Sequence, residues 1–364
     1  MRGGMKIGFR KRLALNLFAN YARLEVRDHE LRQLFWESTL RCCLNCRHCG
    51  SDCTAQETAP DMPLDDFLKV VDTQITPHVD PHRVMVIISG GEPLMRPDLE
   101  TCGIELYKRG YPWGLVTNGM LLNRERFDGL LRAGLHSISV SLDGFESEHN
   151  ALRGHPDSFR RAVEAIRMIV NEPSIIYDII TCITPALFPK LLEFKEFLIG
   201  LGVTHWRIGT IFPAGRAATD RSLQLSDSQK RELMAFIRDM RKEGRIDVSF
   251  SCEGFLGEFE GEVRDHFYCC IAGVNAASIR IDGSISGCTS IRHNFHQGNV
   301  YQDDFWDVWQ NRFQEFRDRS WAKTGPCEHC EAFKYCLGGG MHQRDDNRQL
   351  VDCLYLSLYP RENS

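Results

Sequence analysis

Strand-like and helix-like segments alternate along the first two thirds of the chain, and this alternation constrains the fold more than any other sequence feature. Short apolar runs typical of strands recur near residues 34, 84, 115, 138, 178 and 206. Segments of helical periodicity lie between them, at about 64–76, 97–109, 124–133, 158–171 and 187–200. This order predicts an α/β fold with a parallel sheet whose helices cover its outer face.

Length and composition fit a two-domain soluble protein. The chain has 364 residues, 43% of them hydrophobic and 26% charged. A net charge of −5 gives no sign of nucleic-acid binding. A helix over about 226–243 ends at Gly244, a good stop signal, so we expect a core over 33–245 and a second domain over 246–364. Residues 1–32 form a basic N-terminal helical extension in this division.

Three cysteines follow the first strand at a CxxxCxxC spacing. Cys42, Cys46 and Cys49 can hold three irons of a 4Fe–4S cluster and leave the fourth iron open to a ligand that is not protein. Structural zinc sites instead pair their cysteines and close all four positions. A chance grouping, or zinc with ligands elsewhere, is the alternative interpretation.

A glycine pair follows the second strand, in the sequence Ser89-Gly90-Gly91-Glu92-Pro93. The two glycines let the backbone approach a ligand closely, and Glu92 offers a hydrogen-bond acceptor. Taken alone, such a segment is an ordinary turn between a strand and a loop. Its place after the cysteine triplet makes it far more specific.

Three further motifs follow in order: Leu115–Gly119 (LVTNG), Ser137–Gly144 (SISVSLDG) and Arg153. Together with the cysteine triplet and the glycine pair, they resemble the motifs of the radical S-adenosylmethionine (SAM) superfamily. The resemblance covers most of residues 34–220 and implies a partial (β/α)6 TIM-like barrel with its site at the carboxyl ends of the strands. It implies that the three cysteines carry the catalytic 4Fe–4S cluster. It assigns contacts with SAM to His48, Gly90, Gly91, Glu92, Asn118, Ser141 and Arg153.

The resemblance also implies an activity. Enzymes of this family reductively cleave SAM to a 5′-deoxyadenosyl radical, which abstracts hydrogen from an unactivated carbon. An electron donor such as flavodoxin or ferredoxin is then a partner. Fe–S clusters need a reducing compartment, and no secretory signal or membrane-spanning apolar run is evident, so we expect a cytoplasmic enzyme.

A second set of cysteines occupies the last third of the chain. Cys270 is followed by Gly283 and Cys288, and then come Cys327, Cys330, Cys336 and Cys353. This pattern resembles the SPASM extension of radical SAM enzymes that modify peptides and proteins, which holds auxiliary 4Fe–4S clusters. The last four cysteines would close one such cluster. A zinc knuckle is the alternative.

The chain departs from the SPASM pattern at one position. The pattern expects a cysteine four residues after Cys336, and Gly340 stands there. That cysteine would serve a first auxiliary cluster with Cys270, Cys288 and one of Cys252 or Cys269. This cluster is therefore absent, has an open iron, or uses a non-cysteine ligand. His342 is a candidate substitute, although a histidine near a glycine-rich turn is more often a surface residue.

The SPASM resemblance favours a peptide or protein substrate whose side chain is crosslinked, epimerised or oxidised. Thr289 stands where sulfatase maturases carry an aspartate after the residue that matches Cys288, so formylglycine formation is less expected. The N-terminus also lacks the length for a winged-helix leader-binding domain. Small-molecule chemistry of the haem-biosynthesis type is the alternative activity. A non-catalytic Fe–S scaffold is the third hypothesis.

The N-terminal segment is basic, and four apolar residues recur in it at helical spacing: Leu13, Leu17, Tyr21 and Leu24. We favour a helix that packs on the barrel through this stripe and exposes its basic face. A peripheral membrane contact through an amphipathic helix is the alternative. Residues 5–24 also resemble a Bacteroidetes group of radical SAM enzymes paired with lipoproteins.

Overall fold

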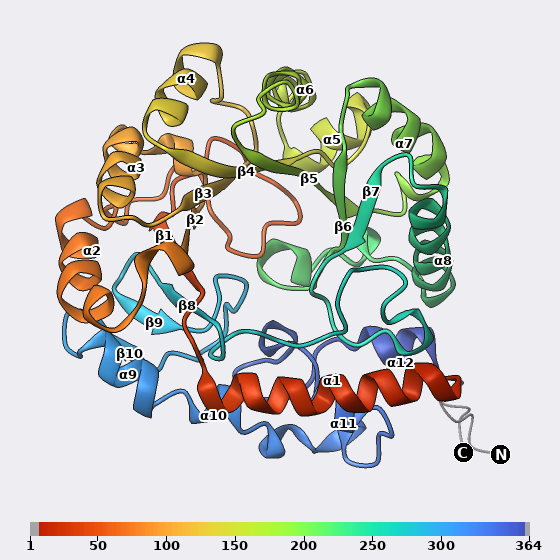
Figure 1. The fold of residues 1–364 in the computed structure, drawn as a ribbon. Helices are drawn as coiled ribbons and strands as arrows, with labels where there is room; N and C mark the ends of the chain where they lie inside the picture. The colour runs from red at the N-terminus through yellow and green to blue at the C-terminus, as the bar shows by residue number, and fades with distance from the viewer. Residues whose placement is uncertain (1–6, 361–364) are drawn as a thin grey trace.

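One ten-stranded sheet organises the protein, which was analysed as a computed structural model that describes residues 7–360 (Figure 1). The strand order is β10-β9-β8-β1-β2-β3-β4-β5-β6-β7. Strands β1 to β7 run parallel in chain order, which confirms the six predicted strands and adds β7 to them. Their bounds are Gln33–Thr39, Met85–Gly90, Trp113–Thr117, Leu135–Ser141, Ile176–Ile183, His205–Thr210 and Asp247–Phe250. Because the order ends at β7 and β10, the barrel is open.

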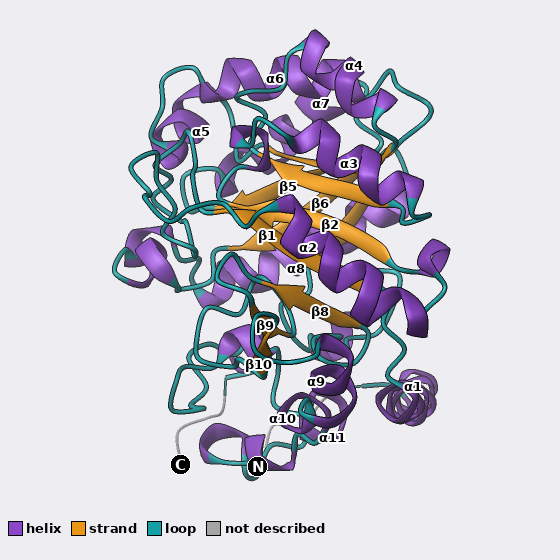
Figure 2. Cartoon of the chain, turned by 90° about the vertical axis from the view of Figure 1, so that its left-hand side faces the viewer, coloured by secondary structure: helices purple, strands orange, loops and turns teal. Residues whose placement is uncertain are grey.

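Helices connect the parallel strands and cover the outer face of the sheet (Figures 1 and 2). They are α2 Leu64–Val70, α3 Leu99–Lys108, α4 Arg124–Arg132, α5 Glu146–Arg153, α6 Ser158–Ile169, α7 Leu191–Gly200 and α8 Asp227–Glu243. Aromatic pairs join the two layers. Trp36 of β1 stacks on Phe67 of α2 with ring centroids 4.1 Å apart, and Trp206 of β6 packs edge-on against Phe194 of α7.

The opposite face of the sheet is polar. Side chains alternate between the two faces of a strand, so residues beside the outward Trp36 and Trp206 point inward. Glu37 and Arg207 are such residues, and Ser139 and Asp178 lie on the same inner face of β4 and β5. The inner face of the sheet therefore carries polar and charged side chains.

The C-terminal region is joined to the core through the same sheet. β8 (Ala276–Ile279) pairs in parallel with β1, and β9 (Ser284–Ser286) and β10 (Gly298–Asn299) extend that edge. The short helices α9 Phe305–Asn311, α10 Gln314–Arg317, α11 Phe333–Cys336 and α12 Leu354–Leu358 follow. The predicted boundary after residue 245 falls just before β7, and that division of the chain stays a prediction.

Helix α1 (Phe9–Asp28) confirms the N-terminal helix but corrects its orientation. Leu15 is buried, Phe18 packs on Phe267, and Lys11 pairs with Glu262, so the helix lies on the C-terminal region rather than on the barrel. The predicted stripe of Leu13, Leu17, Tyr21 and Leu24 is exposed instead. The helix has two apolar stripes, and among residues 7–360 the stripe that includes Leu15 is the one packed against another segment.

Lys6, part of the basic N-terminal segment, lies outside the described residues. Within residues 7–360, no helix combines the length and apolar character needed to cross a membrane.

Candidate active site and auxiliary metal sites

The loop after β1 brings the cysteine triplet together. Cys42 and Cys46 are buried, and Cys49 packs against the same small apolar group. The loop is fixed by backbone contacts, since Cys42 N–H donates to Thr54 O and the Arg216 guanidinium donates to Cys46 O at 2.7 Å. Among the described residues, no three cysteine sulfurs lie within 4.8 Å of one another. The three thiols share one small buried group, which agrees with a common site for them.

The glycine pair at the end of β2 packs against the chain's own backbone, and its predicted contact with SAM stays a prediction. A Cβ at Gly90 would lie 2.0 Å from Thr39 O, and one at Gly91 would lie 2.3 Å from Arg41 O. Gly91 N–H and Glu92 N–H donate to these same two oxygens, at 2.8 and 2.9 Å. The glycines thus allow the loop to pack directly against the segment that leads into the cysteine triplet.

Glu92 is buried, and groups of the chain itself hold its carboxylate. Oε1 accepts from Thr117 Oγ1 at 2.7 Å and from Leu94 N–H, while Oε2 accepts from Asn118 N–H at 2.8 Å. Burial raises the pKa of Glu92, and these hydrogen bonds oppose that rise. These hydrogen bonds show that Glu92 positions the LVTNG segment. A direct contact of Glu92 with SAM stays a prediction.

Asn118 reaches the cysteine loop from the end of β3. Its amide nitrogen lies 3.8 Å from Cys42 Sγ and 3.6 Å from Cys43 Sγ. Ser141 ends β4 on the inner face of the sheet and is partly exposed there. Both residues are therefore on the side of the sheet predicted to hold SAM, and their contacts with it stay predictions.

Arg153 lies between the cysteine loop and β4, and an ion pair holds it in place. Its Nε donates to Asp143 Oδ2 at 2.6 Å, and Nη1 lies 3.8 Å from Cys46 Sγ. Burial would raise the pKa of Asp143, but the Arg153 charge and smaller contributions from neighbouring groups together hold that pKa at about 2. The sequence analysis gave no role to Asp143, which belongs to the SLDG motif. In the structure, its carboxylate holds the Arg153 guanidinium in place.

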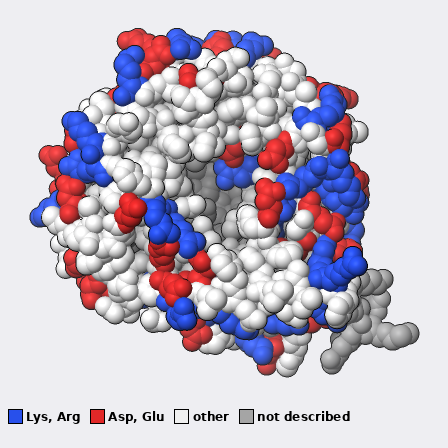
Figure 3. All heavy atoms as spheres, in the orientation of Figure 1, with Lys and Arg blue, Asp and Glu red and all other residues white. Residues whose placement is uncertain are grey.

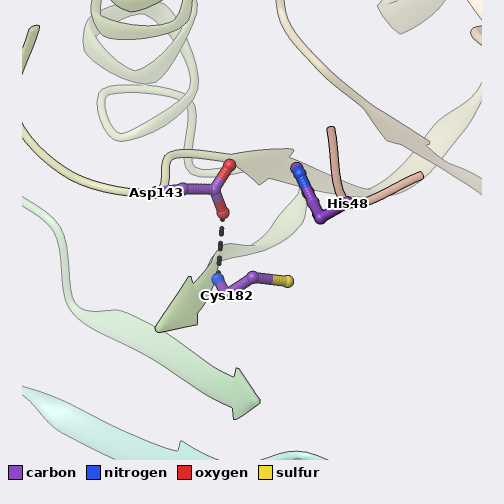
Figure 4. A group of neighbouring side chains, drawn as sticks. All are labelled: His48, Asp143 and Cys182. Carbon is purple, nitrogen blue, oxygen red and sulfur yellow. Dashed lines mark hydrogen bonds between the residues drawn. The ribbon is translucent and has the colours of Figure 1, made fainter. Parts of the chain in front are cut away.

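His48 and Cys182 adjoin the same carboxylate (Figure 4). Ligand atoms of His48, Asp143 and Cys182 all lie within 4.8 Å of one another, and Cys182 N–H donates to Asp143 Oδ1. Burial lowers the pKa of His48 to about 4, so its imidazole is neutral at pH 7. Cys182 lies near the end of β5, and the fold places its thiol beside this carboxylate.

Four cysteines of the C-terminal region line one small cavity. They are Cys327, Cys330, Cys336 and Cys353, the set predicted to close an auxiliary cluster. Arg344 is buried and lies with Nη2 3.6 Å from Cys327 Sγ, so a positive charge faces the predicted thiolates. The donor set and the charge fit a 4Fe–4S cluster, whose net charge is negative.

A second thiol group lies nearby. Cys252, Cys270 and Cys288 are close enough for their charges to affect one another, and Cys269 adjoins Cys270. Tyr268 is buried beside them, and its hydroxyl has no hydrogen-bond partner among the described residues. Their role as ligands of a first auxiliary cluster stays a prediction.

Comparison with known proteins identifies both parts of the chain. A family model described as the radical SAM superfamily matches residues 36–197, and SPASM, described as an iron-sulfur cluster-binding domain, matches residues 269–331. The chain is a radical SAM enzyme with a SPASM domain. These domains imply SAM, the 4Fe–4S cluster that binds it, and an auxiliary 4Fe–4S cluster. The residues of both sites fit these groups.

Relatives of this radical SAM–SPASM enzyme differ in substrate. It is 28% identical over 329 residues to the AdoMet-dependent heme synthase of Methanosarcina barkeri, covering 84% of this chain and 90% of the relative. It is also 28% identical over 316 residues to the mycofactocin maturase MftC of Mycolicibacterium smegmatis, covering 85% and 77% of the two chains.

Solved structures confirm the fold of the enzyme. The structure of anSMEcpe with bound AdoMet superposes with a TM-score of 0.70 at 18% identity, covering 91% of this chain and 94% of that one. Streptococcus suis SuiB bound to S-adenosylmethionine gives 0.66 at 19% identity, covering 87% and 75%.

Proposed function

We propose that this radical SAM enzyme abstracts hydrogen from a side chain of a peptide or protein and so modifies it by crosslinking, epimerisation or oxidation. When bound, the cluster at Cys42, Cys46 and Cys49 and its SAM supply the 5′-deoxyadenosyl radical for that step. The chain's own residues bind and orient these groups. Arg153, held by Asp143, offers a fixed positive charge beside Cys46, and Asn118 offers its amide beside Cys42.

The pairing of charges on the inner face carries this proposal. Arg207 donates to Asp178 at 2.6 Å, and Arg280 and Arg292 both pair with the buried Glu37. These arginines are thus neutralised by carboxylates of the chain. Figure 3 shows a hollow on this face with basic and acidic side chains at its rim. Such a site suits a peptide, whose backbone is neutral, better than a porphyrin that carries several carboxylates.

Porphyrin chemistry is the second candidate function. The similarity to the heme synthase of Methanosarcina barkeri favours this candidate, because the matched region covers 90% of that protein. A porphyrin with several carboxylates would need Arg207, Arg280 or Arg292 to exchange its carboxylate partner for the substrate. Exchange at Arg280 or Arg292 would remove one of the two charges that neutralise the buried Glu37, which is costly for a buried carboxylate.

Deuterium transfer distinguishes the two candidates. The anaerobically reconstituted enzyme is incubated with SAM, reductant and either of two probes. One probe is the peptide fraction of host cells grown in heavy water, and the other is deuterated iron coproporphyrin III. We expect deuterium in 5′-deoxyadenosine with the peptide fraction only. Deuterium from the porphyrin alone would overturn the proposal and establish the second candidate.

We further propose a peripheral membrane contact through α1. Phe9 is 81% and Leu17 62% exposed, on the face that also carries Leu13, Tyr21 and Leu24. Arg10, Arg12 and Arg23 flank this stripe and form no ion pair with a described residue. Exposed apolar side chains beside unpaired arginines suit an anionic lipid surface. We place the enzyme in the cytoplasm, with flavodoxin or ferredoxin as electron donor, and its fifteen free thiols agree with a reducing compartment.

Vesicle sedimentation tests this contact. Leu17→Ser should weaken binding to vesicles containing phosphatidylglycerol by about tenfold, since it removes most of one leucine's apolar burial. Leu192→Ser on α7 is the matched control, because Leu192 is 60% exposed but lies far from the arginine-flanked stripe in sequence. Equal binding by the two variants, or equal binding to pure phosphatidylcholine, would contradict the membrane contact.

A further inference from the structure

Gly340, which replaces the expected SPASM cysteine, has its side-chain space taken by another residue. A Cβ built on Gly340 would lie 2.6 Å from Cε1 and 2.8 Å from Nδ1 of His342. Real Cβ atoms essentially never approach so closely, so a cysteine at 340 would require the imidazole to move. The His342 ring therefore occupies the space that the side chain of the expected SPASM cysteine would need.

This place adjoins the thiols of the first auxiliary site. The same Cβ would lie 3.4 Å from Tyr268 Oη. Burial and then the charges of Cys270 and Cys252 raise the pKa of Tyr268, so these two thiols lie within electrostatic range of it. The side chain of Gln343 stabilises the turn there. Its Nε2 donates to Glu253 O at 3.1 Å, and its Oε1 accepts from Gly340 N–H at 2.8 Å. The 340–343 turn is thus held against the segment that carries Cys252.

The His342 ring is oriented and available. It is partly buried, which corrects its interpretation as a simple surface residue, and it packs edge-on against Phe212 with centroids 5.2 Å apart. Its ring nitrogens make no hydrogen bond with any described residue. A nitrogen without a partner can donate its lone pair to a metal, and imidazole replaces thiolate as an iron ligand in Rieske centres.

We propose that His342 supplies the fourth ligand of a first auxiliary 4Fe–4S cluster whose other ligands are Cys252, Cys270 and Cys288. The enzyme then carries two auxiliary clusters, and Gly340 is the residue that makes room for the imidazole. Tyr268 serves this cluster as a hydrogen-bond donor through its buried hydroxyl. The inference concerns ligation and holds whether the substrate is a peptide or a porphyrin.

Pulsed EPR of the reduced protein tests this ligation. The parent for every sample carries Cys42→Ala, Cys46→Ala and Cys49→Ala, so that its signals come from auxiliary clusters alone and no SAM nitrogen contributes. The parent should hold about eight irons per chain, two clusters of four. Labelling with ¹⁵N-histidine should change the nitrogen hyperfine coupling of one cluster.

Three further variants on this parent separate His342 from its neighbours. His342→Ala should abolish the histidine coupling and lower either the iron count or the occupancy of one cluster. His342→Cys should keep about eight irons while losing the coupling, which shows that the protein still folds and that the position itself ligates. Tyr268→Phe should retain the coupling. About four irons in the parent, or a histidine coupling that survives in both His342 variants, would overturn the proposal.

Discussion

At the scale of single residues, one buried ion pair dominates the predicted SAM site. The Asp143 side chain is fully buried and that of Arg153 is 10% exposed. Both are desolvated, so neither tolerates the loss of the other. The pair explains why an arginine two turns along α5 can stand beside Cys46 in a fixed orientation.

Asp143→Asn should therefore lower the free energy of unfolding of the apo protein by about 3–5 kcal/mol, because it leaves the Arg153 charge buried without a partner. Asp178→Asn is the control, since its Arg207 partner is 40% exposed and such pairs contribute about 0–1 kcal/mol. Urea denaturation measures both. Similar losses for the two variants would show that Arg153 is not held mainly by Asp143.

Glu253 gives the protein a pH dependence. Burial raises its pKa to about 7, although Thr210 donates to the carboxylate through both N–H and Oγ1. Between about pH 4.5 and 7 the folded state then binds more protons than the unfolded state, so the free energy of unfolding falls as pH rises. The fall is at most about 3 kcal/mol. Urea denaturation of the apo protein at pH 5 and pH 8 should show this contribution as a difference between the wild type and Glu253→Gln, because buried His48 changes the stability in the opposite sense in both proteins.

At the scale of elements, the loop after β2 determines where the cysteine loop lies. Gly91 allows the contact with Arg41 O, and Glu92 ties the same loop to the end of β3. Three successive loops at the strand ends are thus connected before any ligand binds. Such a prearranged site reduces the ordering needed when a cofactor binds.

Gly91→Ala should displace the cysteine loop, because its Cβ would lie 2.3 Å from Arg41 O and 2.7 Å from Leu40 O. We expect the reconstituted variant to lose the iron of one cluster, about four atoms per chain. Iron analysis and far-UV circular dichroism measure the loss and the fold. Gly200→Ala is the control, since a Cβ there meets nothing within 4 Å and the helical position favours alanine. Full iron content in Gly91→Ala would refute the positioning role.

At the scale of the whole molecule, the two matched domains share one sheet. β8 pairs with β1 in a register from Gln33–Ala276 to Trp36–Ile279, so β1 is an inner strand only because the C-terminal region is present. An edge strand left open by removing that region would expose its N–H and C=O groups to other chains.

A fragment of residues 1–245 should therefore aggregate, although the radical SAM match ends well before residue 245. A fragment of residues 30–364 keeps all ten strands and loses only α1, so it should remain soluble and folded. Size-exclusion chromatography of both fragments distinguishes them. A monomeric, cooperative 1–245 fragment would show that β8 is dispensable and that the predicted boundary divides independent folding units.

Local patterns in the sequence were enough to predict most elements of the core and to group the cysteines proposed as metal ligands. The alternation of short apolar runs and helical periodicity placed β1 to β6 and six connecting helices, because these signals reside within windows of about ten residues. Cysteine spacing grouped Cys327, Cys330, Cys336 and Cys353, which line one cavity. Spacing is informative here because few chemistries other than metal binding require it.

Contacts between distant segments were decided only by the tertiary structure. The buried face of α1, the backbone that meets Gly90 and Gly91, and the imidazole that fills the space at Gly340 each depend on residues far away or on the exact path of a turn. A sequence window shows that a helix has an apolar stripe, but not which stripe finds a partner. That outcome depends on the shape and charge of the surface opposite, which exists only once the chain has folded.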